Sequence, residues 1–263
     1  MNIHRVLALL LKHGFLMRRS VTRAMEILYW PVLDLLVWGY VSVYLMHQMG
    51  GGPNIVAYFL GGLIFWEVLF RSQQAITISF LEDVWARNLL NLFVSPLTPA
   101  EFILSTILLG VVKTAIGAAV MGLLAWLLYS FNIFTVGPAL IAYFAGLLLL
   151  GWAVGIVTTA LILRFGQSAE ILAWGLAFLL QPFVCVFYPL SALPTVLQKI
   201  AWWIPATHVF EGMRVSLSGG ALDPVRLAWA YGLDLIYLAA AGFLFHAMFE
   251  QARARGLLMK LEF

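Results

Sequence analysis

Six long apolar stretches dominate the sequence, and each is long enough to cross a membrane as one helix. A spanning helix needs about 20 consecutive, mostly apolar residues. The stretches are 27–46, 55–80, 102–129, 137–163, 171–187 and 225–249. Hydrophobic residues make up 63% of the 263 residues and charged residues only 10%, whereas soluble domains carry about 25% charged residues. The sequence therefore predicts an all-α polytopic membrane protein with six transmembrane helices in a single domain, residues 1–263.

Lysine and arginine are distributed unevenly between the predicted turns. Loops rich in these residues face the cytoplasm in most membrane proteins. One side carries Arg5, Lys12, Arg18, Arg19, Arg23, Arg87, Arg164, Arg253, Arg255 and Lys260. The opposite side carries only Lys199, Arg214 and Arg226. This pattern places both termini in the cytoplasm, in an inner membrane of bacterial type, and it explains the net charge of +3 without a nucleic-acid partner.

Residues 1–23 are predicted to form an amphipathic helix on the cytoplasmic membrane surface. Ile3, Val6, Leu7 and Leu10 recur at helical spacing, while Arg5 and Lys12 lie toward the other face. The arginines would then meet anionic lipid. The alternative is a positively charged flank that only sets the topology. The stretch does not have the long apolar core of a signal peptide.

The loop 81–102 contains a second predicted amphipathic helix, ended by Pro96 and Pro99. Glu82 and Asp83 would open it, since acidic residues are favoured in the first helical turn. A short amphipathic helix on the cytoplasmic face could dock into a groove of a soluble partner or rest on lipid headgroups. The candidate docking residues are Glu82, Asp83, Trp85, Arg87, Asn88 and Leu89.

The segment 183–214 interrupts its apolar run with Pro189, Pro194 and Pro205. Proline cannot donate the backbone hydrogen bond of a continuous helix, and broken backbone is tolerated in membranes only where protein or water covers it. The segment therefore predicts a re-entrant hairpin at the outer face before the last span, which could act as a gate. The candidate gate or substrate-pathway residues are Phe187, Tyr188, Trp202, Trp203, His208, Glu211 and Arg214.

Two alternatives stay open within this segment. The aromatic residues could form an interfacial belt or line an exit path for a sugar or lipid. His208, Glu211 and Arg214 follow one another at spacing three, so they could cross-link the hairpin or take part in gating. Two potential metal ligands without a third do not make a metal site, and none is predicted.

Five charged residues lie inside the predicted spans: Asp34, Glu67, Arg71, Lys113 and Asp234. Such residues are costly in hydrocarbon and are candidates for function. Glu67 and Arg71 have the spacing of a helical ion pair, and Lys113 is expected to approach Asp34 or Asp234. The alternative is a role in gating or substrate binding.

Two small-residue features complete the set of candidates. Gly151 and Gly155 are four residues apart, which allows close approach of another helix, either within one subunit or between subunits. Cys185 is the only cysteine, so an internal disulfide is excluded.

The chain resembles the type-2 ABC exporter permeases, which include nodulation-factor, polysaccharide and drug exporter permeases. The resemblance is carried by Pro189-Leu190-Ser191, Leu193-Pro194, Leu197-Gln198, Ala201, Pro205, Thr207-His208, Glu211 and Arg214, together with Glu26, Trp30-Pro31 and Asp34 in the first span and the Ser95-Pro96-Leu97 turn. It implies a permease that pairs with a second copy and binds two cytoplasmic ATPase subunits through its N-terminal helix and its 81–102 loop.

The sequence has no Gly-x-x-x-x-Gly-Lys-Ser/Thr phosphate-binding loop. The resemblance therefore implies that ATP and Mg bind to a separate partner, and that this chain binds no cofactor and is not an enzyme. The cargo would be an amphipathic, lipid- or glycan-type or drug-like molecule.

Two other classes fit the sequence less well than an exporter does. An ion-coupled secondary transporter usually shows inverted repeats, which the sequence lacks. An intramembrane enzyme would need a catalytic motif such as HExxH or GxSxG, and neither occurs here.

Overall fold

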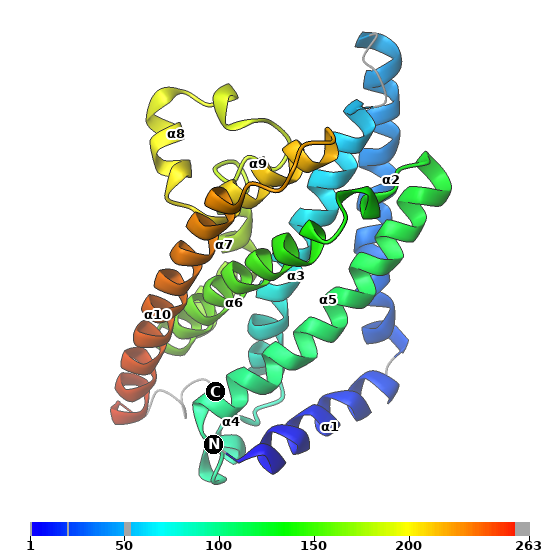
Figure 1. Ribbon diagram of the computed structural model, residues 1–263. Helices are drawn as coiled ribbons and strands as arrows, with labels where there is room; N and C mark the ends of the chain where they lie inside the picture. Colours follow the sequence, from blue (N-terminus) through cyan, green and yellow to red (C-terminus); the bar gives the residue numbers. More distant parts are fainter. Residues whose placement is uncertain (1, 20, 50–53, 256–263) are drawn as a thin grey trace.

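The computed structural model describes residues 2–19, 21–49 and 54–255, and all regular structure in these ranges is helical (Figure 1). The α-helices are α1 (Ile3–Arg19), α2 (Val21–Met49), α3 (Asn54–Trp85), α4 (Leu89–Val94), α5 (Pro99–Tyr129), α6 (Ala139–Phe165), α7 (Leu172–Leu180), α8 (Thr195–Trp202), α9 (Pro205–Leu217) and α10 (Pro224–Ala254). Short 3-10 helices lie at η1 (Ile133–Val136), η2 (Gly166–Ala169) and η3 (Leu190–Ala192).

Five of the helices are long and apolar enough to cross a membrane. The qualifying stretches are Leu28–Gln48, Ile55–Trp85, Pro99–Tyr129, Ala139–Phe165 and Pro224–Ala254. They overlap the first four predicted spans and the last one. The structure therefore confirms a polytopic helical architecture at these five positions.

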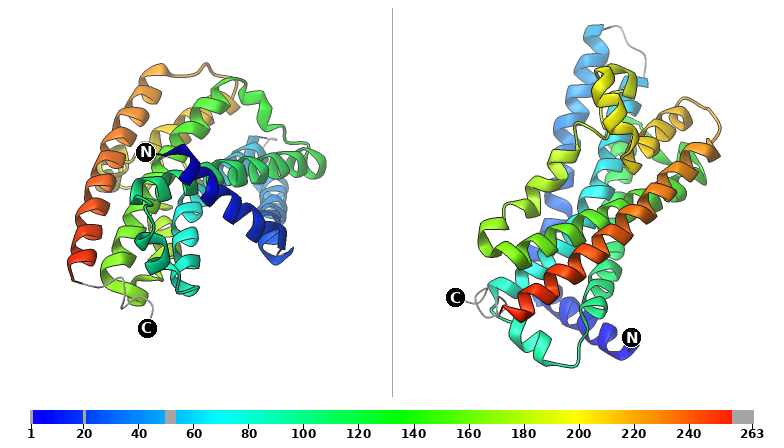
Figure 2. Two further views of the ribbon diagram at one scale, coloured as in Figure 1. Left: turned by 90° about the horizontal axis from the view of Figure 1, so that it is seen from below. Right: turned by 90° about the vertical axis from the view of Figure 1, so that its left-hand side faces the viewer.

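The fifth predicted span, 171–187, is not one continuous helix. Its regular part is α7, which has only 9 residues, and turns follow up to residue 188. Pro182 has no backbone N–H to donate, and Cys185 has a φ of 59°, in a region that breaks helical geometry. The chain still runs from the lower end of α6 through α7 to α8 at the other end of the bundle (Figures 1 and 2). The count of six spans remains a prediction.

α3 is the central helix, and close packing of α6 against it depends on two glycines. A Cβ added to Gly151 would lie 1.6 Å from Ser72 Oγ, and one added to Gly155 would lie 2.9 Å from the backbone oxygen of Gln73. Both glycines therefore serve contact between helices of the same chain, which decides between the two alternatives given above.

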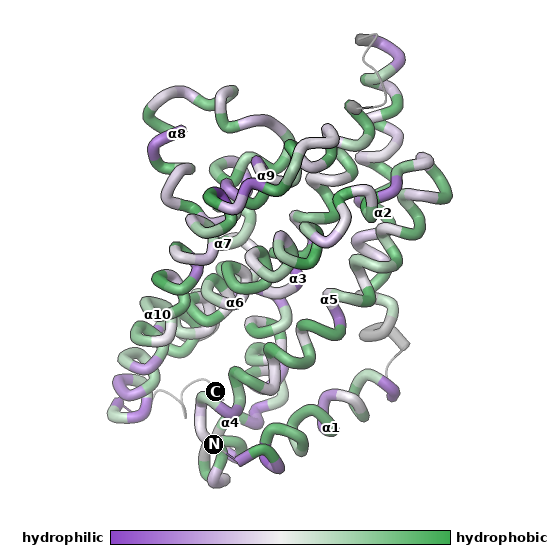
Figure 3. The backbone as a smooth tube through the Cα atoms, viewed as in Figure 1, coloured by the Kyte–Doolittle hydropathy of each residue, from purple (hydrophilic) through white to green (hydrophobic). Residues whose placement is uncertain are grey.

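The two ends of the bundle differ in what they carry. α1, α4 and the C-terminal end of α10 lie at one end, which we call the α4 end, while α8, α9 and η1 lie at the opposite α9 end (Figures 1 and 2). Figure 3 shows mostly hydrophobic residues along the long helices and hydrophilic ones gathered at α4 and the end of α10. The N-terminal helix and the end of α10 thus share one end of the bundle.

Candidate functional site

At the α4 end, the sequence-based boundary of the loop helix is wrong. α3 continues to Trp85, so Glu82 and Asp83 close a helix and do not open one. Because the C-terminus of a helix disfavours anions, Asp83 needs compensating partners. Lys12 Nζ lies 2.5 Å from Asp83 Oδ1, and Asn88 Nδ2 donates to the same oxygen at 3.0 Å. The helix within the loop is the short α4, which starts after Asn88.

The six candidate docking residues do not form one surface. Trp85 is 49% exposed and Arg87 is also exposed, whereas Asp83 is buried and Leu89 is 0% exposed. Val94, at the end of α4, is 84% exposed. The exposed surface at this end therefore centres on Trp85, Arg87 and Val94, whereas Leu89 packs into the core beneath it.

α1 is fastened to this end by polar contacts. Glu101 forms a capping box with Thr98 at the start of α5, accepts from the Asn2 backbone N–H at 2.6 Å, and lies 3.5 Å from Arg5 Nη1. Arg5 and Lys12 thus pair with acidic groups of the protein, and the approach of the basic residues of α1 to anionic lipid stays a prediction.

α1 nevertheless has two faces. Val6, Leu9 and His13 are buried against the bundle, and an apolar stripe at every fourth position is exposed: Ile3, Leu7, Leu11 and Phe15. Its location on a membrane surface remains a prediction.

At the α9 end, α8 and α9 form a hairpin whose tip is capped by side chains. The last carbonyl groups of a helix have no partner within the helix. His208 Nε2 lies 2.8 Å from the Trp202 carbonyl oxygen, and Tyr237 of α10 donates to the Trp203 carbonyl oxygen at 3.2 Å. Since a carbonyl only accepts, Nε2 of His208 carries the proton. Burial lowers the pKa of His208, and its hydrogen bond to Trp202 opposes this shift.

One face of α9 contacts the broken fifth crossing. Thr207 Oγ1 donates to the Phe183 carbonyl at 3.4 Å, and Glu211 Oε1 accepts from the Leu190 N–H at 2.9 Å. Arg214 Nη1 donates to Glu211 at 2.9 Å, and its Nη2 reaches carbonyl oxygens of the turn. The polar residues of α9 therefore join the hairpin to the crossing.

The four aromatic candidates divide between two environments. Phe187 is stacked on Trp38 of α2 and Phe59 of α3, with ring centroids 4.8 and 5.9 Å apart. Tyr188 donates to the carbonyl of Pro182. Trp202 lies against the ring of His208, with ring centroids 4.8 Å apart, and both Trp202 and Trp203 are exposed. They do not form a single aromatic cluster.

Among the intramembrane charges, the ion pair of Glu67 with Arg71 is confirmed at 2.9 Å. Asp34 of α2 lies close enough to interact with Arg71. Asp234 is fully buried, and neither of its oxygens accepts a hydrogen bond from Lys113 or from any other described residue. The approach of Lys113 to Asp34, the other alternative given above, stays a prediction.

Sequence reasoning missed the contacts of two adjacent glutamines in α3. Gln73 and Gln74 both donate to the carbonyl of Ala173 in α7, at 3.0 and 2.7 Å. Two neighbouring amides inside an apolar span are costly unless they are hydrogen-bonded. Their presence in the sequence could have predicted a polar contact with another helix.

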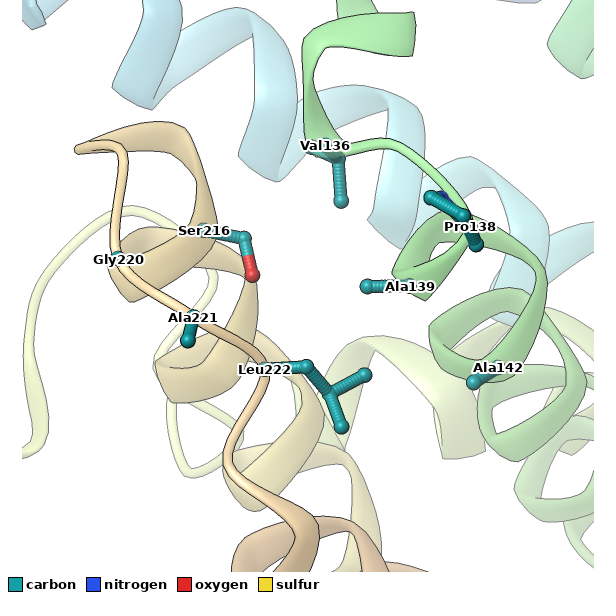
Figure 4. Close-up of a pocket in the computed structure, with 8 residues that line it drawn as sticks. All are labelled: Val136, Pro138, Ala139, Ala142, Ser216, Gly220, Ala221 and Leu222. Atoms are coloured by element: carbon teal, nitrogen blue, oxygen red, sulfur yellow. The ribbon is translucent and has the colours of Figure 1, made fainter.

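A cavity of about 440 Å³ opens at the α9 end between the start of α6 and the residues that follow α9 (Figure 4). Its walls are mostly small and apolar, and its hydroxyl group, from Ser216, pairs with Tyr143 at 3.2 Å. Across the described residues, no group of three or more His, Cys, Asp or Glu could hold a metal ion.

The family model of the ABC-2 type transporters matches residues 7–218, which include α4, α9 and most of α1 but not α10. The chain belongs to the ABC-2 type transporter family. A search of curated proteins found no significant match. Family membership makes the chain a multi-pass transport permease, and ABC-2 permeases generally work with an ATP-binding subunit.

Proposed function

We propose that this ABC-2 permease is the membrane subunit of an ATP-driven exporter. Two copies would pair and bind two separate ATP-binding subunits, which hold ATP and Mg. The exporter would move an amphipathic, lipid- or glycan-type or drug-like molecule out of the cytoplasm or the inner leaflet. The family match over residues 7–218 carries this proposal.

The α4 end is the proposed ATPase-docking surface. Trp85, Arg87 and Val94 are exposed there, on a helix end and a short helix that α1 braces through Lys12 and Asp83. Because this apolar and basic patch is braced, it cannot move without α3. Movement of a bound soluble partner would therefore be transmitted to α3. The α9 end, with its hairpin, is the proposed outer gate.

ATPase partnership is tested by co-purification. The permease is expressed with a candidate ATP-binding subunit, purified and placed in lipid, and ATP hydrolysis is measured with and without candidate cargo. A stable complex with cargo-stimulated hydrolysis is expected. A permease that carries cargo without any ATPase, driven by an ion gradient, would contradict the proposal.

Cytoplasmic location of the α4 end is a separate prediction. The described basic residues at this end include Arg18, Arg19, Arg87, Arg164 and Arg253, and basic loops remain in the cytoplasm. A reporter that is active only in the periplasm should be inactive when fused after residue 263 and active when inserted between residues 219 and 222. The reverse result would invert the topology and place the proposed ATPase surface on the wrong side.

A further inference from the structure

The turn formed by residues 185–188 in the fifth crossing is not held by its own backbone. In the described part of the chain, none of these four residues donates or accepts a backbone–backbone hydrogen bond. Cys185 also has a φ of 59°, which is unfavourable for a residue other than glycine. Buried backbone groups need partners, so this 185–188 turn depends on groups from elsewhere in the molecule.

Arg214 of α9 supplies donors to the carbonyl groups of this turn. Its Nη2 donates to the carbonyls of Cys185 and of Tyr188, the latter at 2.7 Å, and lies 3.3 Å from the carbonyl oxygen of Val186. The guanidinium group also lies over the ring of Tyr58 in α3, 4.9 Å from its centroid. The guanidinium carries its donors on separate nitrogens in a fixed plane. Nη1 can therefore hold Glu211 while Nη2 holds the turn, whereas the single nitrogen of a lysine would have to serve both.

The chain on either side of the turn is fastened by two other side chains of α9. Thr207 holds the Phe183 carbonyl, and Glu211 holds the Leu190 N–H. α9 itself is mostly buried, and Gly212 lies against Tyr143 of α6 so closely that an added Cβ would be 2.9 Å from the ring. The support is therefore fixed, and only the middle of the turn depends on the single arginine.

Arg214 can release the carbonyls without losing its counter-charge. Glu211 Oε1 lies 2.9 Å from Arg214 Nη1 and would keep the charge paired. Water can replace protein donors at freed carbonyls at little net cost, whereas an unpaired buried charge would be strongly unfavourable. The turn can thus open as soon as water reaches it.

The closed turn seals against α3. The Val186 carbonyl oxygen would lie 2.6 Å from a Cβ added to Gly62, so only glycine permits this approach. The Cys185 side chain is fully buried behind it. Movement of the turn away from Gly62 would open this contact and expose Cys185.

We propose that Arg214 is a latch that holds the 185–188 turn closed against α3, and that its release uncovers Cys185. The latch rests on the proposed outer gate, because opening of the α9 end would admit the water that replaces Arg214. Arg214 is a positioning residue in this scheme and need not touch cargo.

The test uses Cys185, the only cysteine of the chain, as a built-in probe. The purified permease in lipid nanodiscs is treated with a membrane-impermeant maleimide, and the labelling rate is measured. Wild-type protein should label slowly. Arg214→Gln should label at least about tenfold faster, as expected from the loss of charge-assisted hydrogen bonds, and Arg214→Lys should also label faster.

Arg226→Gln is the matched control. Arg226 Nη1 lies 3.6 Å from the same Glu211 but has no hydrogen bond to the turn, so its loss should leave Cys185 protected. Equal labelling of wild-type and Arg214→Gln protein, or equally fast labelling of Arg226→Gln, would overturn the latch. Each variant is compared as the monodisperse fraction from size-exclusion chromatography, so that misfolded protein is excluded.

Wild-type protein provides a mutation-independent arm. In complex with the ATPase and a trapped nucleotide, Cys185 should label faster than without nucleotide. If the complex hydrolyses ATP and transports cargo while Cys185 stays protected in every nucleotide state, the latch does not open and the proposal fails. If no ATPase binds at all, the proposed exporter fails, while the comparison of the isolated variants still decides whether Arg214 holds the turn.

Discussion

Gly151→Leu is expected to prevent most of the protein from reaching its folded state. The Cβ of the new side chain alone would lie 1.6 Å from Ser72 Oγ and 2.6 Å from the backbone oxygen of Leu69. A backbone atom cannot move aside as a side chain can, so α6 would have to separate from α3. Overpacking of a core costs about 1–3 kcal/mol and sometimes more, and here the central helix contact is involved. We expect a loss of about 3 kcal/mol or more, measured as thermal unfolding in detergent and as yield of monodisperse protein.

Gly242→Leu in α10 is the control for this substitution. An added Cβ at Gly242 has no neighbour within 4 Å, so the same change in volume and propensity should leave the unfolding temperature nearly unchanged. Similar losses for both variants would show that leucine is harmful at any glycine of these helices and that the α3–α6 contact is not special.

Trp85→Glu combined with Val94→Glu is expected to uncouple transport from ATP hydrolysis. Both side chains are exposed at the α4 end, so the fold should tolerate the charges, whereas Leu89 is buried and would not. Losing a central apolar anchor of an interface costs about 2 kcal/mol or more, which corresponds to roughly thirtyfold weaker docking. Transport in proteoliposomes should fall at least about tenfold at an ATPase concentration near the dissociation constant, while hydrolysis by the ATPase continues.

The control places the same charge at the other end of the molecule. Phe134 in η1 is exposed at the α9 end, and Phe134→Glu should leave ATPase binding intact. If the double variant binds the ATPase and transports cargo as wild type does, the proposed docking surface lies elsewhere.

The sequence was informative where the structure depends on residues close together in the chain. Five apolar stretches coincide with long helices because a helix in lipid satisfies its own backbone. Glu67 and Arg71 could be paired from their spacing alone, since residues four apart on a helix are neighbours. These features depend on short-range geometry, which is visible in one sequence.

Features set by long-range packing were harder to predict. Asp83 looked like the first turn of a new helix, but its partner Lys12 lies 71 residues away and allows α3 to continue past it. Leu89 looked like part of an exposed amphipathic face, yet it packs inward beneath α4. The break in the fifth crossing was missed although Pro182 lies within it, and the turn that follows is contacted by Arg214, 26 to 29 residues further along the chain.

The hairpin tip lies deep along α10. Tyr237, which holds the Trp203 carbonyl, is about 20 Å from Pro224 along the helix axis at the usual rise per residue. α10 has 31 residues and is thus about 46 Å long, compared with about 30 Å of hydrocarbon. If α10 is centred, the exposed indoles of Trp202 and Trp203 lie among lipid tails and not among headgroups. Thinning of the leaflet beside the hairpin would bring the headgroups closer to these indoles, so the acyl-chain length of the surrounding lipid becomes a variable that sets how the hairpin rests.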